Sequence, residues 1–406
     1  MKQRNFYLWS CWTAVLILLL ADDADSFGVL HPRRFGDTRS GVSVSSSRRG
    51  SSFSLDATQH DNDVKTEQQE QEELVMIEGV VAPLKYLGPY PCLTLRFPEE
   101  QAPAVDFMLD TGANINSIDS QCFQDYFAET ADLMFDSHTN HIVGSAGVGG
   151  KFAAGDLYDL GDAVLDGLPP PDLPICHNFT AAVLPHASAV GKGILGQLFL
   201  MQYPGGVEFD WYGTDGDPPT IILHFTQSLS AETLQNTKAV PFQRLTTQVM
   251  AFNLTLNEKI TIPALLDTGA PMTVLSPEVA TAAGISYYSE QDVDSSREQQ
   301  HPPSLDNKVL TVGGIDGKHM MLYRSKDPIT MTAGEDGVNF GSGHVFVGEL
   351  PGLQLLNAYG ETTIPKAIFG LDALRQNIYR MIIHGCENQL LFEELKNEED
   401  TKTQKL

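Results

Sequence analysis

Several kinds of chemistry have no motif in this sequence of 406 residues. It contains neither Gly-x-Ser-x-Gly nor His-Glu-x-x-His, so the patterns of serine hydrolases and zinc proteases are missing. Its five cysteines and eleven histidines are scattered without metal-ligand spacing, so we expect no metal and no cofactor. Beyond Cys11, four cysteines remain, which could form two disulfides in any of three connectivities or stay as thiols: Cys92, Cys122, Cys176 and Cys386.

Positive charge is scarce as well. Lys and Arg number 26 against 52 Asp and Glu, which gives a formal net charge of −26. Such a balance disfavours nucleic acids and anionic membranes as partners. The mostly apolar run at residues 12–21 is shorter than the roughly 20 residues of a spanning helix, and no later segment is longer and equally apolar. We therefore expect no stable membrane span once this run has been removed.

The N-terminal region changes composition twice. Residues 1–26 carry two basic residues, the apolar run and then small residues, which is the pattern of a signal peptide. Residues 27–56 are rich in Ser and Arg, which fits either a transit peptide of an alga with complex plastids or the propeptide of a secreted or vacuolar protein. Residues 57–74 are acidic and predict a disordered linker. We expect entry into the secretory pathway, with plastid, secreted and vacuolar destinations all open.

The tetrapeptide Asp-Thr-Gly-Ala occurs twice, at residues 110–113 and 267–270. Each copy directly follows five mostly apolar residues, so we expect a buried strand that delivers Asp110 or Asp267 to a tight glycine turn. Two acidic groups presented in the same way can meet across a pseudo-twofold axis.

Each tetrapeptide also has a downstream partner of two apolar residues and a glycine. The partners are Ile194, Leu195 and Gly196 in the first half and Ile368, Phe369 and Gly370 in the second. The separations from Asp to Gly are 196 − 110 = 86 and 370 − 267 = 103 residues. Separations of this size are too long for a local turn and similar enough to indicate duplicated lobes.

This combination of motifs resembles aspartic proteases of the pepsin and retropepsin group, over roughly residues 75–395. The resemblance implies an all-β bilobal fold, with two pseudo-symmetric β-barrel-like lobes around a central cleft and few short helices. Both motifs end in Ala, where pepsin-like enzymes usually have Ser, so the chain looks most like a fused, two-lobed retropepsin-like protease. Since it carries both lobes, we expect a monomer.

The resemblance assigns catalysis to Asp110 and Asp267, one from each lobe. It implies that the neighbours of these residues support the dyad: Thr111, Gly112, Ala113, Thr268, Gly269 and Ala270. In this family the threonine hydroxyls bind the opposite backbone, and the apolar-apolar-Gly segments named above support the two loops. Pro271 stands where the first copy has Asn114 and offers no N–H, so the two halves of the cleft are expected to contact a substrate differently.

Two carboxyl groups in contact can hydrolyse a peptide bond without a metal, because one accepts a proton from water while the other donates one. Like charges about 3 Å apart do not both ionise easily, so we expect one raised and one lowered apparent pKa for the pair. Without a serine donor, activity is expected to peak at mildly acidic pH. The sequence thus predicts an aspartic endopeptidase acting on peptides or proteins. The alternatives are a non-catalytic peptide-binding protein with this fold and a protease acting mainly on its own propeptide.

Two glycine-rich segments flanked by strand residues are candidate flaps over the cleft: Gly147, Gly149 and Gly150, and Gly313 and Gly314. We expect an N-terminal lobe over residues 75–225, a linker over 226–238, a C-terminal lobe over 239–395 and a charged tail over 396–406. Short helices are expected at residues 120–127, 277–283 and 371–377.

Overall fold

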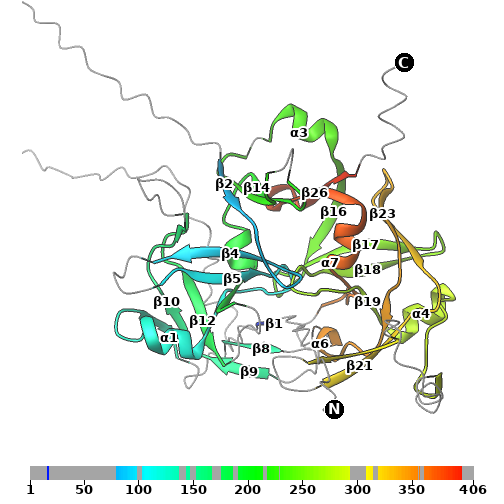
Figure 1. Cartoon of the computed structure of the whole chain (residues 1–406), viewed down its shortest axis with the longest axis horizontal. Coiled ribbons are helices and arrows are strands. Elements are labelled where there is room, and N and C mark those ends of the chain that lie inside the picture. Colours follow the sequence, from blue (N-terminus) through cyan, green and yellow to red (C-terminus); the bar gives the residue numbers. More distant parts are fainter. Residues whose placement is uncertain are drawn as a thin grey trace, which may run out of the picture. The chain divides into compact units, whose positions relative to one another are not determined.

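The computed structural model describes part of the chain (Figure 1). The described residues are 16–17, 79–97, 103–136, 143–146, 152–166, 175–185, 191–213, 217–227, 229–292, 308–313, 319–354, 356 and 361–395. Outside them lie almost all of the expected signal peptide (1–26), the segments 27–56 and 57–74, the tail 396–406, and the flap glycines Gly147, Gly149, Gly150 and Gly314. All described residues belong to one compact unit, formed by Met1–Ala24 and Glu78–Leu406.

The described residues are mostly β-strands with few short helices, which confirms the expected all-β fold. One sheet of nine strands holds the first Asp-Thr-Gly-Ala motif. Its strands, in spatial order with β3 beside β4, are β11 (Val164–Leu165), β4 (Tyr90–Arg96), β5 (Val105–Leu109), β13 (Gly193–Leu195), β6 (Ser117–Asp119), β12 (Thr180–Leu184), β10 (Leu157–Asp159), β7 (Asp132–Phe135) and β3 (Lys85–Leu87).

A second sheet, of fifteen strands, holds the second motif and also draws on the first half of the chain. Its strands, in spatial order with β22 beside β17 and β23 beside β22, are β2 (Gly79–Pro83), β15 (Thr220–His224), β14 (Gly206–Asp210), β26 (Ile378–His384), β27 (Gln389–Glu394), β16 (Lys238–Arg244), β17 (Met250–Leu256), β18 (Ile260–Leu266), β25 (Ala367–Phe369), β19 (Val274–Leu275), β24 (Phe346–Val347), β21 (His319–Arg324), β20 (Val309–Gly313), β22 (Ile329–Ala333) and β23 (Val338–Gly343).

A third, small sheet consists of β1 (Leu16–Ile17), β8 (Val143–Ala146) and β9 (Phe152–Gly155). Strands β8 and β9 pair antiparallel, as do β20 and β21 in the larger sheet. The strand residues on both sides of each glycine-rich segment therefore pair as hairpins, whereas most residues of the two tips lie outside the described part.

The short helices follow local start and stop signals. Helix α1 (Ser120–Tyr126) is capped by Asp119, whose side chain accepts from two backbone N–H groups, and helix α4 (Pro277–Ala283) begins after a Ser276 cap and ends at Gly284 in the left-handed region. The other helices are α2 (Gln197–Leu200), α3 (Ala231–Asn236), α6 (Pro351–Gln354) and α7 (Leu371–Asn377). Helices α1, α4 and α7 occupy the three expected ranges, and α3 lies inside the range expected for the linker.

The two halves repeat one strand arrangement around their motifs. In the first half β5 pairs parallel with β13, β13 antiparallel with β6, and β6 parallel with β12. In the second half β18, β25, β19 and β24 pair in the same three ways and the same order. The duplicated motifs therefore lie on duplicated scaffolds, which presents both aspartates from equivalent positions.

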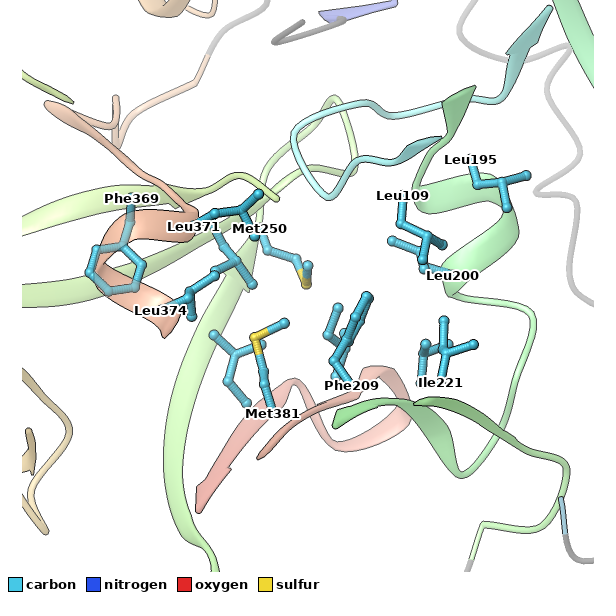
Figure 2. Close-up of a cluster of buried hydrophobic side chains, with 14 of the residues drawn as sticks. Leu109, Leu195, Leu200, Phe209, Ile221, Met250, Phe369, Leu371, Leu374 and Met381 are labelled. Atoms are coloured by element: carbon cyan, nitrogen blue, oxygen red, sulfur yellow. The ribbon is translucent and has the colours of Figure 1, made fainter. Parts of the chain in front are cut away.

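One buried apolar cluster spans both halves (Figure 2). On one side are Leu109 and Leu195, which flank the first motif, and on the other are Phe369 and Leu371, which flank the second (Figure 2). Phe209, on the shared strand β14, is fully buried in the same cluster. Because burying a side chain of this size contributes about 1.5–3 kcal/mol, this cluster stabilises the junction that carries the two motifs.

Candidate active site

Each aspartate lies one residue beyond the end of its strand and is held by the downstream partner segment. The backbone N–H of Asp110 donates to the Leu195 carbonyl, and that of Asp267 donates to the Phe369 carbonyl, both at 3.0 Å. Each partner segment therefore contacts the loop of its aspartate through the residue that precedes the glycine of the segment. Sequence spacing alone could pair these segments only by analogy, and the structure brings them into direct contact.

The alanines that end the two motifs are bound to the same segments. The backbone N–H of Gln197 donates to the Ala113 carbonyl at 2.8 Å, and that of Leu371 donates to the Ala270 carbonyl at 2.9 Å. Ala113 and Ala270 are fully buried. Each loop is thus held at both ends by backbone hydrogen bonds, which fixes the direction in which its carboxyl group points.

The two threonines exchange hydrogen bonds between the halves. The Thr111 hydroxyl donates to the Leu266 carbonyl at 2.9 Å and accepts from the Thr268 N–H at 2.9 Å. The Thr268 hydroxyl donates to the Leu109 carbonyl at 2.8 Å and accepts from the Thr111 N–H at 3.1 Å. These four buried bonds obey a local twofold relation and join residues about 157 positions apart.

The two carboxyl groups face each other across this axis, as the positions of the loop glycines show. A Cβ atom added to Gly112 would lie 2.7 Å from Asp267 Cγ, and one added to Gly269 would collide with the Asp110 carboxyl. Glycine is thus required at both positions because the opposite carboxyl group occupies the space of a side chain. Asp110 and Asp267 are both fully buried.

Burial raises the pKa of both aspartates, whereas their proximity acts on the two groups in opposite directions. For Asp110, desolvation and then the charge of Asp267 hold the pKa well above its usual range. For Asp267, desolvation raises the pKa, opposed by Asp110 and by the nearby amides of Gly269 and Ala270. The expectation of one raised and one lowered pKa is therefore wrong, because it considered the mutual repulsion of the two groups and left out the desolvation that both share.

The carboxyl oxygens of the pair accept few well-formed hydrogen bonds. Asp110 Oδ1 accepts from the Gly112 N–H at 2.8 Å. Among the described residues, Asp110 Oδ2 and both carboxyl oxygens of Asp267 accept no hydrogen bond of ordinary geometry, although the amides of Gly269 and Ala270 lie near Asp267. A buried ionised carboxylate without donors is costly, so this surrounding favours a proton held between the two groups.

Two further residues fix the loops and were missed by the sequence motifs. Asn116 Oδ1 accepts from the Gly196 N–H at 3.0 Å, and Thr273 Oγ1 accepts from the Gly370 N–H at 3.2 Å. Both side chains are buried, and each lies six positions after its aspartate. The signal that could have found them is this equal spacing of a polar residue after each Asp-Thr-Gly-Ala motif.

A surface pocket of about 430 Å³ lies beside the second loop. Its lining residues come from the loop, from helix α7 and from the first half of the chain: Pro89, Tyr212, Pro271, Leu371, Asp372, Arg375 and Gln376. Pro271, the position at which the two motifs diverge, is thus part of a pocket wall.

The remaining candidate residues form no second site within the described part of the chain. Cys92, Cys122 and Cys176 are buried free thiols, and Cys386 is an exposed one. Burial raises the pKa of Cys92 to about 12 and those of Cys122 and Cys176 to about 11, so these three thiols stay protonated. Within the described ranges, no three His, Cys, Asp or Glu side chains gather as metal ligands would. The helices of that part of the chain are too short or too polar to span a bilayer.

Known proteins resemble this chain in sequence over one segment and in structure over most of its length. Residues 252–328, which include the second motif, match the family model described as aspartyl protease. This match confirms the resemblance to aspartic proteases that the motifs predicted, and it supports aspartic-type protease activity in general terms. No curated protein matches the sequence.

Among solved structures, the basic 7S globulin from soybean is similar with a TM-score of 0.47 and 11% identity, over 78% of this chain and 95% of that one. Conglutin gamma from lupine seeds has a TM-score of 0.47 and 12% identity, over 80% and 97% of the two chains. The aspartic proteinase from Irpex lacteus has a TM-score of 0.43 and 11% identity, over 78% and 98%.

Proposed function

We propose that this protein is an aspartic endopeptidase in which Asp110 and Asp267 act together on a water molecule. The observation that carries the proposal is the pair of buried, facing carboxyl groups, with three oxygens that accept no well-formed hydrogen bond from the described residues. A structural pair of carboxylates would be expected to accept several hydrogen bonds, because burying charge without them destabilises the fold. A pair that holds one proton is instead ready to accept and to donate one.

The reaction follows from that shared proton. The ionised carboxyl group accepts a proton from water as the water oxygen attacks the carbonyl carbon of the peptide bond, and the protonated one donates to the carbonyl oxygen. The carboxyl group that accepted the proton from water then donates it to the amide nitrogen, the other carboxyl group accepts a proton from a hydroxyl of the tetrahedral intermediate, and the C–N bond breaks. The products are a new carboxyl group and a new amine, and the dyad regains one proton, so that its two members can exchange roles.

The hydrogen bonds that Thr111 and Thr268 exchange, together with the backbone bonds to both loops, serve this reaction by holding the two carboxyl groups at a fixed distance and orientation. Proximity of this kind lowers the barrier only when the reacting groups are already aligned. Pro271 and the pocket beside it support a contact with the peptide on one side of the dyad. The hairpins β8–β9 and β20–β21 are the candidate flaps, and their tips remain a prediction.

The direct test is hydrolysis of a mixed-sequence peptide library by the full chain, with products identified by mass spectrometry. We expect internal cleavage with one oxygen from labelled water in each new carboxyl group. Asp110→Asn and Asp267→Asn should each lower the rate by about 100- to 10,000-fold, the usual contribution of a general acid or base. Asp125→Asn, on the surface of helix α1, is the matched control and should keep the parent rate. A folded parent that cleaves no peptide would favour the peptide-binding alternative.

A second candidate is a precursor that acts first on its own N-terminal region. Two observations favour it: the dyad is fully buried in the whole chain, and β1 (Leu16–Ile17) pairs antiparallel with β8 of the first hairpin. Incubation of the full chain, followed by mass spectrometry of its N-terminus, tests this candidate. We expect a new N-terminus in the parent and none in Asp110→Asn. An intact N-terminus in a chain that already cleaves added peptides at its full rate would exclude the candidate.

A further inference from the structure

In each half of the site, a chain of hydrogen bonds that we call a tether runs from the residue six positions after the aspartate and holds the loop. The two tethers end on different kinds of acceptor. Asn116 and Thr273 occupy the same position after each motif, and each accepts a hydrogen bond from the glycine of its partner segment. Their backbone carbonyls also match, since Asn116 accepts from the Ala182 N–H and Thr273 from the Phe346 N–H, both at 3.0 Å. In the first half the Asn116 amide then donates to the Thr180 carbonyl at 3.0 Å, a backbone acceptor.

In the second half the tether ends on a side-chain carboxyl group. Asp372 Oδ1 accepts from the Thr273 hydroxyl at 2.7 Å and from the Thr273 N–H at 2.8 Å. The same oxygen accepts from the Ala373 N–H at 2.7 Å. One carboxyl oxygen therefore receives three short bonds, two of them from the segment that carries Asp267.

These bonds form a continuous path to the candidate catalytic loop. Asp372 orients the Thr273 hydroxyl, the hydroxyl accepts from the Gly370 N–H, and the Leu371 N–H next to it donates to the Ala270 carbonyl. Ala270 in turn donates its N–H to the Asp267 carbonyl at 3.2 Å. The path is made of hydrogen bonds with defined geometry, so a change at Asp372 reaches the loop through Thr273, in addition to any effect on the pocket wall that Asp372 shares with Pro271.

We propose that Asp372 is a positioning residue that, through Thr273, holds the loop of Asp267 in its working geometry. The inference rests on the proposed function, because it concerns the same dyad. The first half needs no such group, since its tether ends on the Thr180 carbonyl. Asp372 is thus the side-chain acceptor on which the second tether ends, where the first tether ends on a backbone carbonyl.

A purely structural role for Asp372 would be to stabilise the start of helix α7, in whose first turn it lies. That role predicts a loss of stability, with normal turnover by the molecules that remain folded. A positioning role predicts slower turnover by each correctly folded molecule. Counting active sites by titration with a tight-binding transition-state mimic separates the two, because it gives the turnover number per competent site.

The test compares kcat and KM, per titrated site, in the parent and in Asp372→Ala. We expect kcat to fall about 10- to 100-fold with KM within about twofold, as for a small misplacement of a reacting group. Asp372→Asn keeps an oxygen acceptor and should recover most of the lost kcat. Glu278→Ala removes an exposed acidic residue from the first turn of α4 and should leave kcat unchanged.

Thr273→Val breaks the same path from its other end and serves if Asp372→Ala does not fold. It should lower kcat to a similar extent, and the double variant should be no slower than the slower single variant, since both remove one tether. An unchanged kcat per site in either single variant, with an active parent, would overturn the inference. An inactive parent would instead overturn the proposed function, so that the two failures are distinguishable.

Discussion

The raised pKa values of the dyad predict that removing one of its carboxyl groups stabilises the fold at neutral pH. In the folded chain the pKa of Asp267 is raised from 3.8 to about 7, chiefly by desolvation. Because the folded value is above the unfolded one, this group contributes its full stability below about pH 4, and the contribution is lost as the pH rises toward 7. The amide side chain of the Asp267→Asn variant cannot ionise, so this variant does not lose that stability as the pH rises.

The size of the effect follows from the same shift. A rise from 3.8 to about 7 corresponds to at most about 4 kcal/mol, at 1.36 kcal/mol for each pH unit. The unfolding free energy of Asp267→Asn minus that of the parent should therefore increase by up to about 4 kcal/mol between about pH 4 and pH 8. Asp110→Asn should behave in the same way, since its pKa is raised too.

Urea unfolding at a series of pH values measures this difference, with the fluorescence of the buried Trp211 as the signal. Asp106→Asn is a control of opposite sign. Partial burial opposes ionisation of Asp106, but hydrogen bonds from Lys85 and Thr94 outweigh this effect and lower the pKa. The unfolding free energy of Asp106→Asn should therefore fall relative to that of the parent as the pH rises from acid to neutral. A difference between Asp267→Asn and the parent that does not vary with pH would refute the shared, desolvated proton.

Three further predictions concern the residues around the dyad. Gly112→Val should be inactive in peptide hydrolysis, because its Cβ would lie 2.7 Å from Asp267 Cγ; full activity would contradict the facing geometry. Thr111→Val removes two buried bonds between the halves and should lower the urea unfolding free energy by about 2–3 kcal/mol, with Thr111→Ser losing less; equal losses would count against the hydroxyl bonds. Pro271→Asn should change KM across a series of peptides more than it changes kcat. If KM stayed the same for every peptide, Pro271 would not contact the substrate.

The sequence predicted those parts of the site that local motifs encode. Asp-Thr-Gly-Ala after an apolar run was enough to place Asp110 and Asp267 at strand ends, and the capping residues Asp119 and Ser276 precede two of the expected helices. These features depend on neighbours within a few positions, where turn chemistry and hydrophobic pattern are informative. The duplication then predicted that the two loops would meet.

The sequence could not show which residues would become buried, or would form hydrogen bonds, where the two loops meet. The tether from Thr273 to Asp372 joins positions 99 apart, and the equivalent position in the first half holds Asn116 with a different final acceptor. Nothing local distinguishes Asp372 from an ordinary helix-start residue. The strength of desolvation at Asp267 likewise depends on the packing of both halves, so it became visible only in the folded chain.

Strand β14, from the first half, pairs directly with β26, from the second, along residues 207–210. The two halves of the site are therefore covalently connected and also share a sheet, so the formation of the dyad requires no encounter between separate molecules. Its assembly should be first order, and the specific activity should stay constant on dilution.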